Sequence, residues 1–290
     1  MKKIDIHVHT SLHKAFGGEL PTIYASVEEL LGMYDALGIE RGVNLPEINP
    51  EGNTYIITND EAMQICDAYP DRMSWFCNID PRQVGNSPDT DFTFLLDYYK
   101  RHGAKGIGEM SANIYFDSPL AFNLFSQAEK FELPIIFHIG YMGGDYGLVD
   151  DVGLPRFERA LQNFPKLKFL GHSQKFWAEI SSDVTQENRH GYPTGKVKPG
   201  RLIELLDKYP NLCCDISAGS GYNALSRDEQ FGCEFVERYQ DRVYFGTDIC
   251  RCPQEVLQGV WLDNMLAAGK ISKLAYEKVC RKNAEQLLGL

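Results

Sequence analysis

The chain has 290 residues, of which 43% are hydrophobic and 24% are charged, a composition typical of a globular protein with a large buried core. Its 29 basic and 40 acidic residues give a net charge of −11, which argues against a nucleic-acid or membrane partner, because both favour an extended basic surface. The sequence starts without a charged-then-apolar leader, has no apolar stretch long enough to span a bilayer, and scatters its eight cysteines through apolar segments. We therefore expect a cytoplasmic protein with reduced thiols.

Short apolar segments alternate with longer segments of helical period along the whole chain. The predicted elements are, in order, strand 3–8, helix 27–38, strand 39–46, helix 59–70, strand 72–80, helix 91–103, strand 104–110, helix 118–132, strand 133–140, helix 155–165, strand 167–173, helix 200–210, strand 211–217, helix 227–239, strand 241–248 and helices from 253 to the end. The strands are continuously apolar, which is typical of parallel strands covered on both faces. Eight such units predict a single α/β domain over residues 1–290, a (β/α)8 TIM barrel.

Two connections in this pattern are unusually long. Residues 139–154 are rich in glycine, and residues 173–199 are polar with embedded aromatic residues. Both segments follow strands at the same rim of the predicted barrel, after the fifth and sixth strands. Because long loops in compact domains are more often functional than idle, we expect these two loops to shape a binding pocket.

The first predicted strand ends in IDIHVH, where one valine separates two histidines. Side chains at positions i and i+2 of a strand point to the same face, so His7 and His9 would emerge side by side. A divalent metal is the usual reason for such a pair. An edge strand that happens to carry two histidines is the alternative.

The carboxyl ends of the other strands carry further polar residues, and in a barrel all these ends converge on one pocket. They are Glu109, His138, His172 and Asp248. Taken singly, each has an ordinary explanation, such as a core histidine, an ion pair of Glu109 with Lys105 or a helix cap at Asp248. Together with the first strand, these imidazole and carboxylate groups predict a site for Zn²⁺, with Mn²⁺ or Fe²⁺ as alternatives.

The ordered motifs HVH, FHIG, GHS and FGTD resemble those of the amidohydrolase superfamily. The most similar branch is the amidohydrolase 2 group of metal-dependent TIM-barrel hydrolases, which is related to amino-carboxymuconate-semialdehyde decarboxylases. The resemblance covers the whole chain, down to the terminal KVCRKNAEQLLGL, which is similar to the last helix of that family. It implies that His7, His9 and His138 are metal ligands.

The resemblance also implies roles for the three remaining residues of the rim. His172 would be either a ligand of a second metal or a free acid or base beside the first. Asp248 would be both a ligand and the base that takes a proton from the activated water. Glu109 lies where some branches place a residue that bridges two metals, so the number of ions, one or two, stays open.

The first functional hypothesis is a metal-dependent hydrolase. A divalent ion lowers the pKa of its water and polarises a carbonyl, which suits the hydrolysis of an amide, lactone or ester. We expect a small substrate that bears a carboxylate. The residues expected to bind it follow strands at the same rim and are Lys175, Arg227, Arg251, Trp177 and Tyr141.

Three other hypotheses follow from the same residues. A non-oxidative decarboxylase of the same superfamily would use similar ligands. The segment IGEM is similar to that of TatD-type nucleases, which would indicate a phosphodiesterase, although the acidic charge provides no basic track for a nucleic acid. A barrel used only for binding would lack one or more ligands, and none is missing. The sequence also leaves open whether two copies form a homodimer.

Overall fold

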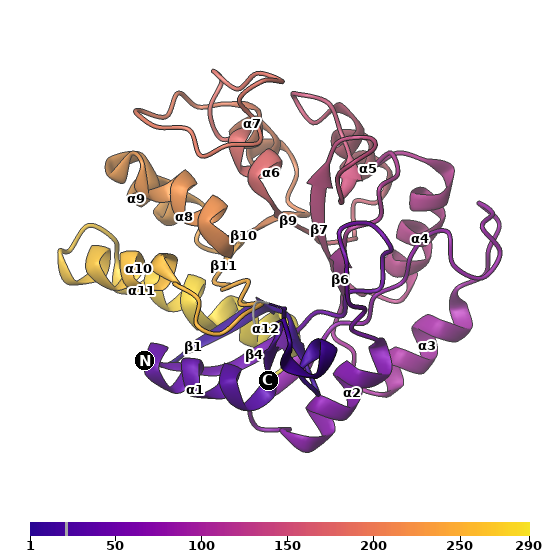
Figure 1. Cartoon of the computed structure of the whole chain (residues 1–290). Coiled ribbons are helices and arrows are strands. Elements are labelled where there is room, and N and C mark those ends of the chain that lie inside the picture. The colour runs from indigo at the N-terminus through magenta and orange to yellow at the C-terminus, as the bar shows by residue number, and fades with distance from the viewer. Residues whose placement is uncertain (21–22) are drawn as a thin grey trace.

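The computed structural model, which describes residues 1–20 and 23–290, forms a barrel of parallel strands surrounded by helices (Figure 1). The barrel strands are β1 (Lys3–Val8), β4 (Ile39–Asn44), β5 (Met73–Trp75), β6 (Ile107–Met110), β7 (Ile135–Gly140), β9 (Phe169–His172), β10 (Leu212–Asp215) and β11 (Val243–Tyr244). Each of them lies within a segment predicted as a strand, so the predicted order of strands is confirmed. The loops add three short strands, β2 (Thr10–Ser11), β3 (Ala25–Ser26) and β8 (Leu148–Val149).

Backbone hydrogen bonds join the strands into a ring. One sheet has the order β1-β4-β5 and the other the order β11-β10-β9-β7-β6. At the seam between β5 and β6, the amide of Cys77 donates to the carbonyl oxygen of Gly106 at 2.9 Å. At the seam between β11 and β1, the amide of Ile6 donates to the carbonyl oxygen of Phe245 at 3.1 Å. These bonds close the predicted (β/α)8 barrel.

Helices cover the outside of the barrel (Figure 1). They are α1 (Val27–Leu37), α2 (Asn59–Ala68), α3 (Thr93–Arg101), α4 (Pro119–Lys130), α5 (Pro155–Asn163), α6 (Gln174–Ala178), α7 (Arg201–Lys208), α8 (Ala218–Ser226), α9 (Glu229–Tyr239), α10 (Leu257–Ala267), α11 (Lys273–Glu277), the π-helix η2 (Lys278–Lys282) and α12 (Asn283–Leu288). Local signals set their starts. Ser26 and Glu29 form a capping box at α1, and Ser118 caps α4 just before Pro119.

The sequence does not predict two of these helices. Helix α6 has only five residues and lies inside the segment 173–199, which was expected to be a loop. Helix α8 has the sequence AGSGYNALS, in which glycine and serine are weak helix formers. Helix α6 packs against β7, β9 and α8, and α8 packs against α6, α9 and α10, which is a tertiary effect that local propensity does not carry.

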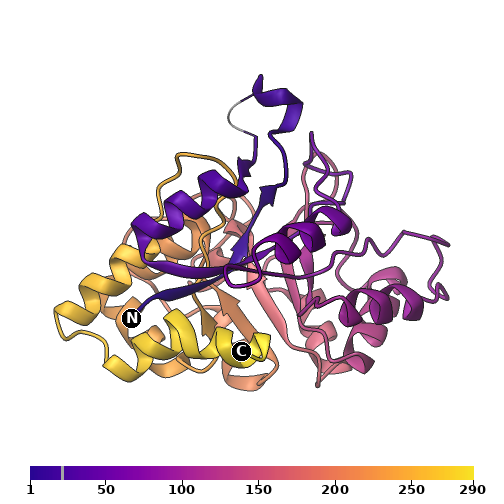
Figure 2. The same ribbon diagram turned by 90° about the horizontal axis from the view of Figure 1, so that it is seen from below.

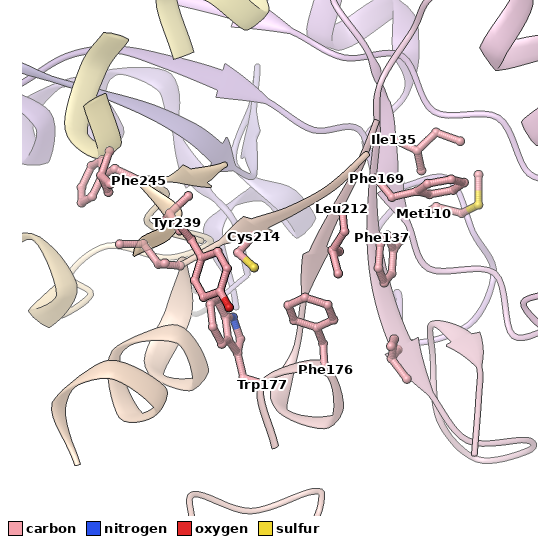
Figure 3. Packing of buried hydrophobic residues seen from close by; sticks show 14 of the residues in the cluster. Met110, Ile135, Phe137, Phe169, Phe176, Trp177, Leu212, Cys214, Tyr239 and Phe245 are labelled. Atoms are coloured by element: carbon pink, nitrogen blue, oxygen red, sulfur yellow. The ribbon is translucent and has the colours of Figure 1, made fainter. Parts of the chain in front are cut away.

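Apolar side chains pack in two places. One set packs between the strands and the outer helices. There the ring centroid of Phe137 lies 6.4 Å from that of Phe169 and 5.9 Å from that of Phe176 (Figure 3). Inside the barrel, a separate cluster includes Ile136 and Leu170. The barrel is therefore a filled core rather than a pore, and the polar side chains at its rim lie above this interior cluster.

The chain termini and one loop complete the outline of the molecule. Both termini lie near each other, and the loop after β1, which carries the short helix η1 (Ala15–Gly18), projects away from the barrel (Figure 2).

All eight cysteines are free thiols. Among the described residues, no helix has the length and apolar composition that crossing a membrane requires.

Candidate metal centre

The alternation of side chains along each strand carries polar residues to the rim of the barrel. Ile136 of β7 and Leu170 of β9 belong to the interior cluster. Two positions later, the same inward face presents His138 and His172. The side chains that face the barrel interior thus change from apolar to polar within two residues along each of these strands.

Strand β1 reaches the same layer by a different route. Its pairing with β4 shifts register between Asp5 and Val8, which interrupts the strict alternation. Ile6 belongs to the interior cluster, and His7 directly after it is fully buried in the polar layer. His9 follows on the same side.

Four of the six residues predicted to form the metal site meet around one point. Nε2 of His7 and Nε2 of His9 lie 3.0 Å apart. Oε2 of Glu109 lies 3.6 Å from the first nitrogen and 3.5 Å from the second. Oδ1 of Asp248 lies at the same two distances, 3.6 and 3.5 Å. Two imidazoles and two carboxylates therefore face a common centre.

The other two predicted residues extend the cluster on the side of Glu109. Nδ1 of His138 donates to Oε1 of Glu109 at 2.9 Å. Nε2 of His172 lies 4.0 Å from the same oxygen and 3.6 Å from Oδ2 of Asp248. Three groups of ligand atoms lie within 4.8 Å of one another: His7, His172 and Asp248; His7, His9 and Glu109; and Glu109, His138 and His172. The structure thus brings all six side chains together.

Hydrogen bonds fix the orientation of the two histidines of β1. Nδ1 of His7 donates to Oδ2 of Asp215 at 2.6 Å, and Nδ1 of His9 donates to the carbonyl oxygen of Leu45 at 2.9 Å. Because both acceptors lack a proton, each imidazole carries its proton on Nδ1 when neutral. Two unprotonated Nε2 atoms then face each other at 3.0 Å.

The same pattern holds for the other two histidines. The hydroxyl of Ser217 donates to Oδ2 of Asp215 at 2.9 Å, so its oxygen accepts from Nδ1 of His172, also at 2.9 Å. His138 uses Nδ1 to donate to Glu109. All four imidazoles therefore bind an acceptor through Nδ1, which leaves the Nε2 atom of each neutral ring as an acceptor without a proton.

This donor set fits a metal ion. Lone pairs of imidazole nitrogens and carboxylate oxygens repel one another at such distances unless a positive charge lies among them. Imidazole and carboxylate together suit Zn²⁺, Mn²⁺ or Fe²⁺. The Nδ1 hydrogen bonds to Asp215 and to the carbonyl of Leu45 are the contacts that hold metal-ligating histidines in place. The cluster can therefore hold a divalent cation.

Buried carboxylates set the charge of the site. Burial opposes protonation of His9, but Glu47 and Glu109 raise the pKa of its imidazole to about 9. Burial also opposes ionisation of Glu109, yet the neighbouring His7 outweighs it and holds the pKa of the carboxyl well below its usual range. Burial and the nearby His7 together lower the pKa of His172. The buried carboxylates thus favour a positive charge among them, which a bound cation would supply.

The backbone of Asp248 adopts a conformation that side chains other than glycine rarely take, with φ at 56°. Its amide donates to the carbonyl oxygen of His7 at 2.8 Å, and its carbonyl oxygen accepts from Nε2 of Gln254 at 2.6 Å. These bonds hold the residue on both sides. Its side chain is 25% exposed, more than any other of the six. Such local strain is typical of functional positions.

Sequence reasoning missed the carboxylates behind the histidines. Asp215 is the polar residue at the carboxyl end of the seventh predicted strand, a position that the reasoning applied to the other strands would have found. Asp5 is fully buried and accepts from the hydroxyl of Tyr34 at 2.6 Å and from the amide of Thr247 at 2.8 Å. No sequence signal marks Asp5, because its partners come from distant segments.

Two of the predicted substrate-binding residues lie together at the rim. Nζ of Lys175 forms a salt bridge of 2.8 Å with Asp145 and lies 4.5 Å from the ring centroid of Tyr141. Lys175 is buried, whereas Tyr141 is 39% exposed. Arg251 is exposed in the loop after Asp248. The role of these three residues in substrate binding stays a prediction.

The other two lie elsewhere. Trp177 is 2% exposed and donates from Nε1 to the carbonyl oxygen of Asp215 at 3.0 Å. Its indole belongs to the core between α6 and the strands (Figure 3), a position that does not support the expected contact with a substrate. Arg227 lies with Trp177 and Tyr192 around a small cavity behind α6. Trp177 lies on α6 and Arg227 directly after α8, the two helices that the sequence does not predict.

Comparisons with known proteins show the family and the fold of this chain. A family model described as Amidohydrolase matches residues 4–290. Among solved structures, 2,6-dihydroxybenzoate decarboxylase from Rhizobium is 16% identical with a TM-score of 0.62, over 100% of this chain and 99% of that one. A probable 2-pyrone-4,6-dicarboxylic acid hydrolase from Acinetobacter baumannii, with citric acid bound, is 13% identical with a TM-score of 0.59, over 100% of both chains.

A third solved structure contains a metal. Dihydroxybenzoic acid decarboxylase from Polaromonas sp. JS666, with bound manganese and the inhibitor 2-nitroresorcinol, is 15% identical with a TM-score of 0.59, over 100% of this chain and 97% of that one. A comparison with curated proteins finds no match. The low identities to solved structures show a common fold, and the family model spans nearly the whole chain. The chain belongs to the Amidohydrolase family, a family of enzymes, as its motifs predict.

Proposed function

We propose that the chain is a metal-dependent hydrolase of amides, lactones or esters of small, carboxylate-bearing molecules. The position of Glu109 is the observation that carries this proposal. Its Oε2 lies 3.6 Å from Nε2 of His7, and its Oε1 lies 4.0 Å from Nε2 of His172. A carboxylate between two groups of ligand atoms could hold two ions at once, and paired ions are used in metal-dependent hydrolysis.

The proposed ligands are the six side chains of the cluster. They are His7, His9, Glu109, His138, His172 and Asp248. We favour His172 as a ligand rather than a free acid, because its Nδ1 proton is directed to Ser217 and its Nε2 is left as an acceptor. Mixed imidazole and carboxylate ligation favours Zn²⁺, with Mn²⁺ or Fe²⁺ as alternatives.

Asp248 is the proposed catalytic base. A bound divalent ion would lower the pKa of a water molecule and polarise the carbonyl of the substrate. Asp248, with 25% of its side chain exposed, is the ligand that a molecule entering from the rim meets first. It would accept the proton of the attacking water and return it to the leaving group. The bonds from its backbone to His7 and Gln254 keep the carboxylate aimed at this position.

A decarboxylase is the second candidate. Two of the three solved structures described above are named as decarboxylases of aromatic acids. In that reaction the carboxylate of the substrate would be lost, and Asp248 or His172 would deliver a proton to the ring carbon. Glu109 supports hydrolysis instead, because a second ion adds a nucleophile that decarboxylation does not need.

Two measurements test the proposal. Protein purified without chelators should contain one to two equivalents of transition metal, and less than about half an equivalent would favour a barrel used only for binding. The loaded protein is then offered small amides, lactones and esters that carry a carboxylate, together with hydroxylated benzoic acids. Hydrolysis supports the proposal. Release of carbon dioxide without any hydrolytic product would replace it with the decarboxylase.

A further inference from the structure

We propose that Lys175 binds a carboxylate of the substrate and that Asp145 occupies this position in the free protein, so that residues 141–147 form a gate that an anionic ligand opens. The inference rests on the proposed function for its class of ligand, a small carboxylate. It goes further by assigning a regulatory contact to a loop whose role the catalytic residues do not explain.

The ammonium group of Lys175 is held in a fixed position. The residue lies on α6, is 4% exposed, and follows His172 by three positions. Its Nζ pairs with Oδ2 of Asp145 at 2.8 Å and lies above the ring of Tyr141. A buried ammonium requires a negative partner, because the cost of removing the charge from water is otherwise not offset.

The partner carboxylate, in contrast, comes from a loop whose preceding residues are exposed to solvent. Residues 141–144 are all exposed, and Met142 has 49% of its surface accessible. Gly143 and Gly144 have φ angles of 76° and 71°, and added Cβ atoms would meet nothing within 4 Å. Segments with so little packing open at low free-energy cost. The cation is therefore built into the core, whereas the anion is carried by a loop.

The next residue of this loop covers the candidate metal centre. The ring of Tyr146 lies 4.4 Å from the ring of His138, between centroids. Its other face packs so closely on Gly52 that an added Cβ there would lie 2.8 Å from Cδ1 of the tyrosine. Tyr146 thus joins the loop after β7 to the loop after β4. Movement of Asp145 away from Lys175 would uncover His138.

The ends of the gate are tied down, which confines the movement to its tip. Nδ2 of Asn113 donates to the carbonyl oxygen of Tyr141 at 3.0 Å, and Oδ1 of Asn113 accepts from the amide of Gly143 at 2.9 Å. The amide of Gly147 donates to the carbonyl oxygen of Ser111 at 2.7 Å. Between these points, the salt bridge of Asp145 is the charged contact that holds the tip.

An exchange of carboxylates keeps the charges of the site in balance. When a ligand carboxylate takes the place of Asp145, Lys175 retains one anionic partner, and the released Asp145 becomes hydrated. The number of ion pairs is unchanged. The ligand must offset the contacts of Tyr146, the hydrogen bond of 3.0 Å that Oδ2 of Asp145 accepts from the amide of Tyr141, and its own loss of motion. A neutral ligand gains no partner and leaves the gate closed. The site therefore selects for a carboxylate.

Benzoate and its neutral counterpart benzamide are suitable probes, with binding measured by calorimetry on metal-loaded protein. Asp145→Asn removes the competing charge at nearly constant shape, so we expect about ten-fold tighter binding of benzoate than in the wild type. Asp151→Asn makes the same change at an exposed aspartate outside the gate and should leave the affinity unchanged. Adding Lys175→Met to Asp145→Asn should abolish the gain, and benzamide should not respond to any variant.

Chymotrypsin, which cleaves after exposed aromatic residues, reports on the gate directly. Cleavage at Tyr141 and Tyr146 should accelerate in Asp145→Asn, and in the wild type when benzoate is added. The proposal is overturned if Asp145→Asn and Asp151→Asn bind benzoate equally well, or if the gain survives Lys175→Met. Should the lysine variant fail to fold, the two aspartate variants and their cleavage rates still decide the matter.

These measurements need no turnover, so the two proposals fail independently. Tighter binding of benzoate by Asp145→Asn without hydrolysis of any amide, lactone or ester would leave the gate standing and remove the hydrolase. Hydrolysis with an unresponsive Asp145→Asn would remove only the gate.

Discussion

Oδ2 of Asp215 accepts a hydrogen bond of 2.6 Å from Nδ1 of His7, across the interior of the barrel from β10 to β1. The same oxygen accepts from the hydroxyl of Ser217, which in turn accepts from Nδ1 of His172. One buried carboxylate thus sets the proton position on two imidazoles and directs both Nε2 atoms toward the centre of the cluster.

Replacing this carboxylate should weaken metal binding without removing a ligand. In Asp215→Asn, the amide no longer supports the Nδ1 proton of His7 with a full charge, and we expect the affinity for Zn²⁺ to fall about 10- to 100-fold. Competition with a chromophoric chelator measures the change. Asp207→Asn, at an exposed aspartate of α7, is the matched control and should bind Zn²⁺ as the wild type does. Equal affinities of the two variants would show that Asp215 has no part in the site.

Glu109→Gln tests whether two ions share the cluster. A glutamine keeps the volume but not the charge, so it cannot bridge two cations as a carboxylate does. We expect the metal content of the purified variant to fall from two equivalents to one, as measured by elemental analysis. A wild-type value of one that the substitution does not change would instead establish a single-ion site and weaken the case for hydrolysis.

Removing the metal should lower thermal stability. Free metal at about 1,000 times its Kd stabilises the fold by about 4 kcal/mol. For a chain of this size that corresponds to a rise in Tm of about 7 °C over the chelated protein. Scanning calorimetry with and without a chelator measures the shift. His138→Ala should lose it, whereas His102→Ala, at an exposed histidine after α3, should keep it.

A packing variant tests the support behind β1. An added Cβ at Gly42 would lie 2.1 Å from the hydroxyl oxygen of Tyr34, which donates to Oδ2 of Asp5 at 2.6 Å. Gly42→Ala should therefore displace this tyrosine and destabilise the fold by about 1–3 kcal/mol in chemical denaturation.

The matched control for this variant lies on the neighbouring helix. Gly32 is in the middle of α1, and an added Cβ there would meet nothing within 4 Å. Gly32→Ala should stabilise the protein by about 0.5–1 kcal/mol, because alanine restricts the unfolded chain and favours the helix. A stability change of the same sign in both variants would contradict the assigned role of Tyr34.

Much of the fold follows from local patterns. Continuous apolar strands separated by helical segments indicate eight βα units, and the boundaries of β1 and β7 agree with the predicted ends at Val8 and Gly140. The pattern failed at α6 and α8, where short or glycine-containing segments become helical only through packing. Local propensity carries little information about such segments.

The sequence by itself determined which six side chains meet, because a parallel barrel delivers the carboxyl ends of all its strands to one rim whatever the details of its loops. Only the tertiary structure decided what holds and covers them. Asp215 reaches His7 across 208 positions of the chain, and Asp145 reaches Lys175 from a different loop. Such contacts depend on the direction in which loops and side chains fold back over the barrel. That direction results from packing between distant segments, which no short stretch of sequence encodes.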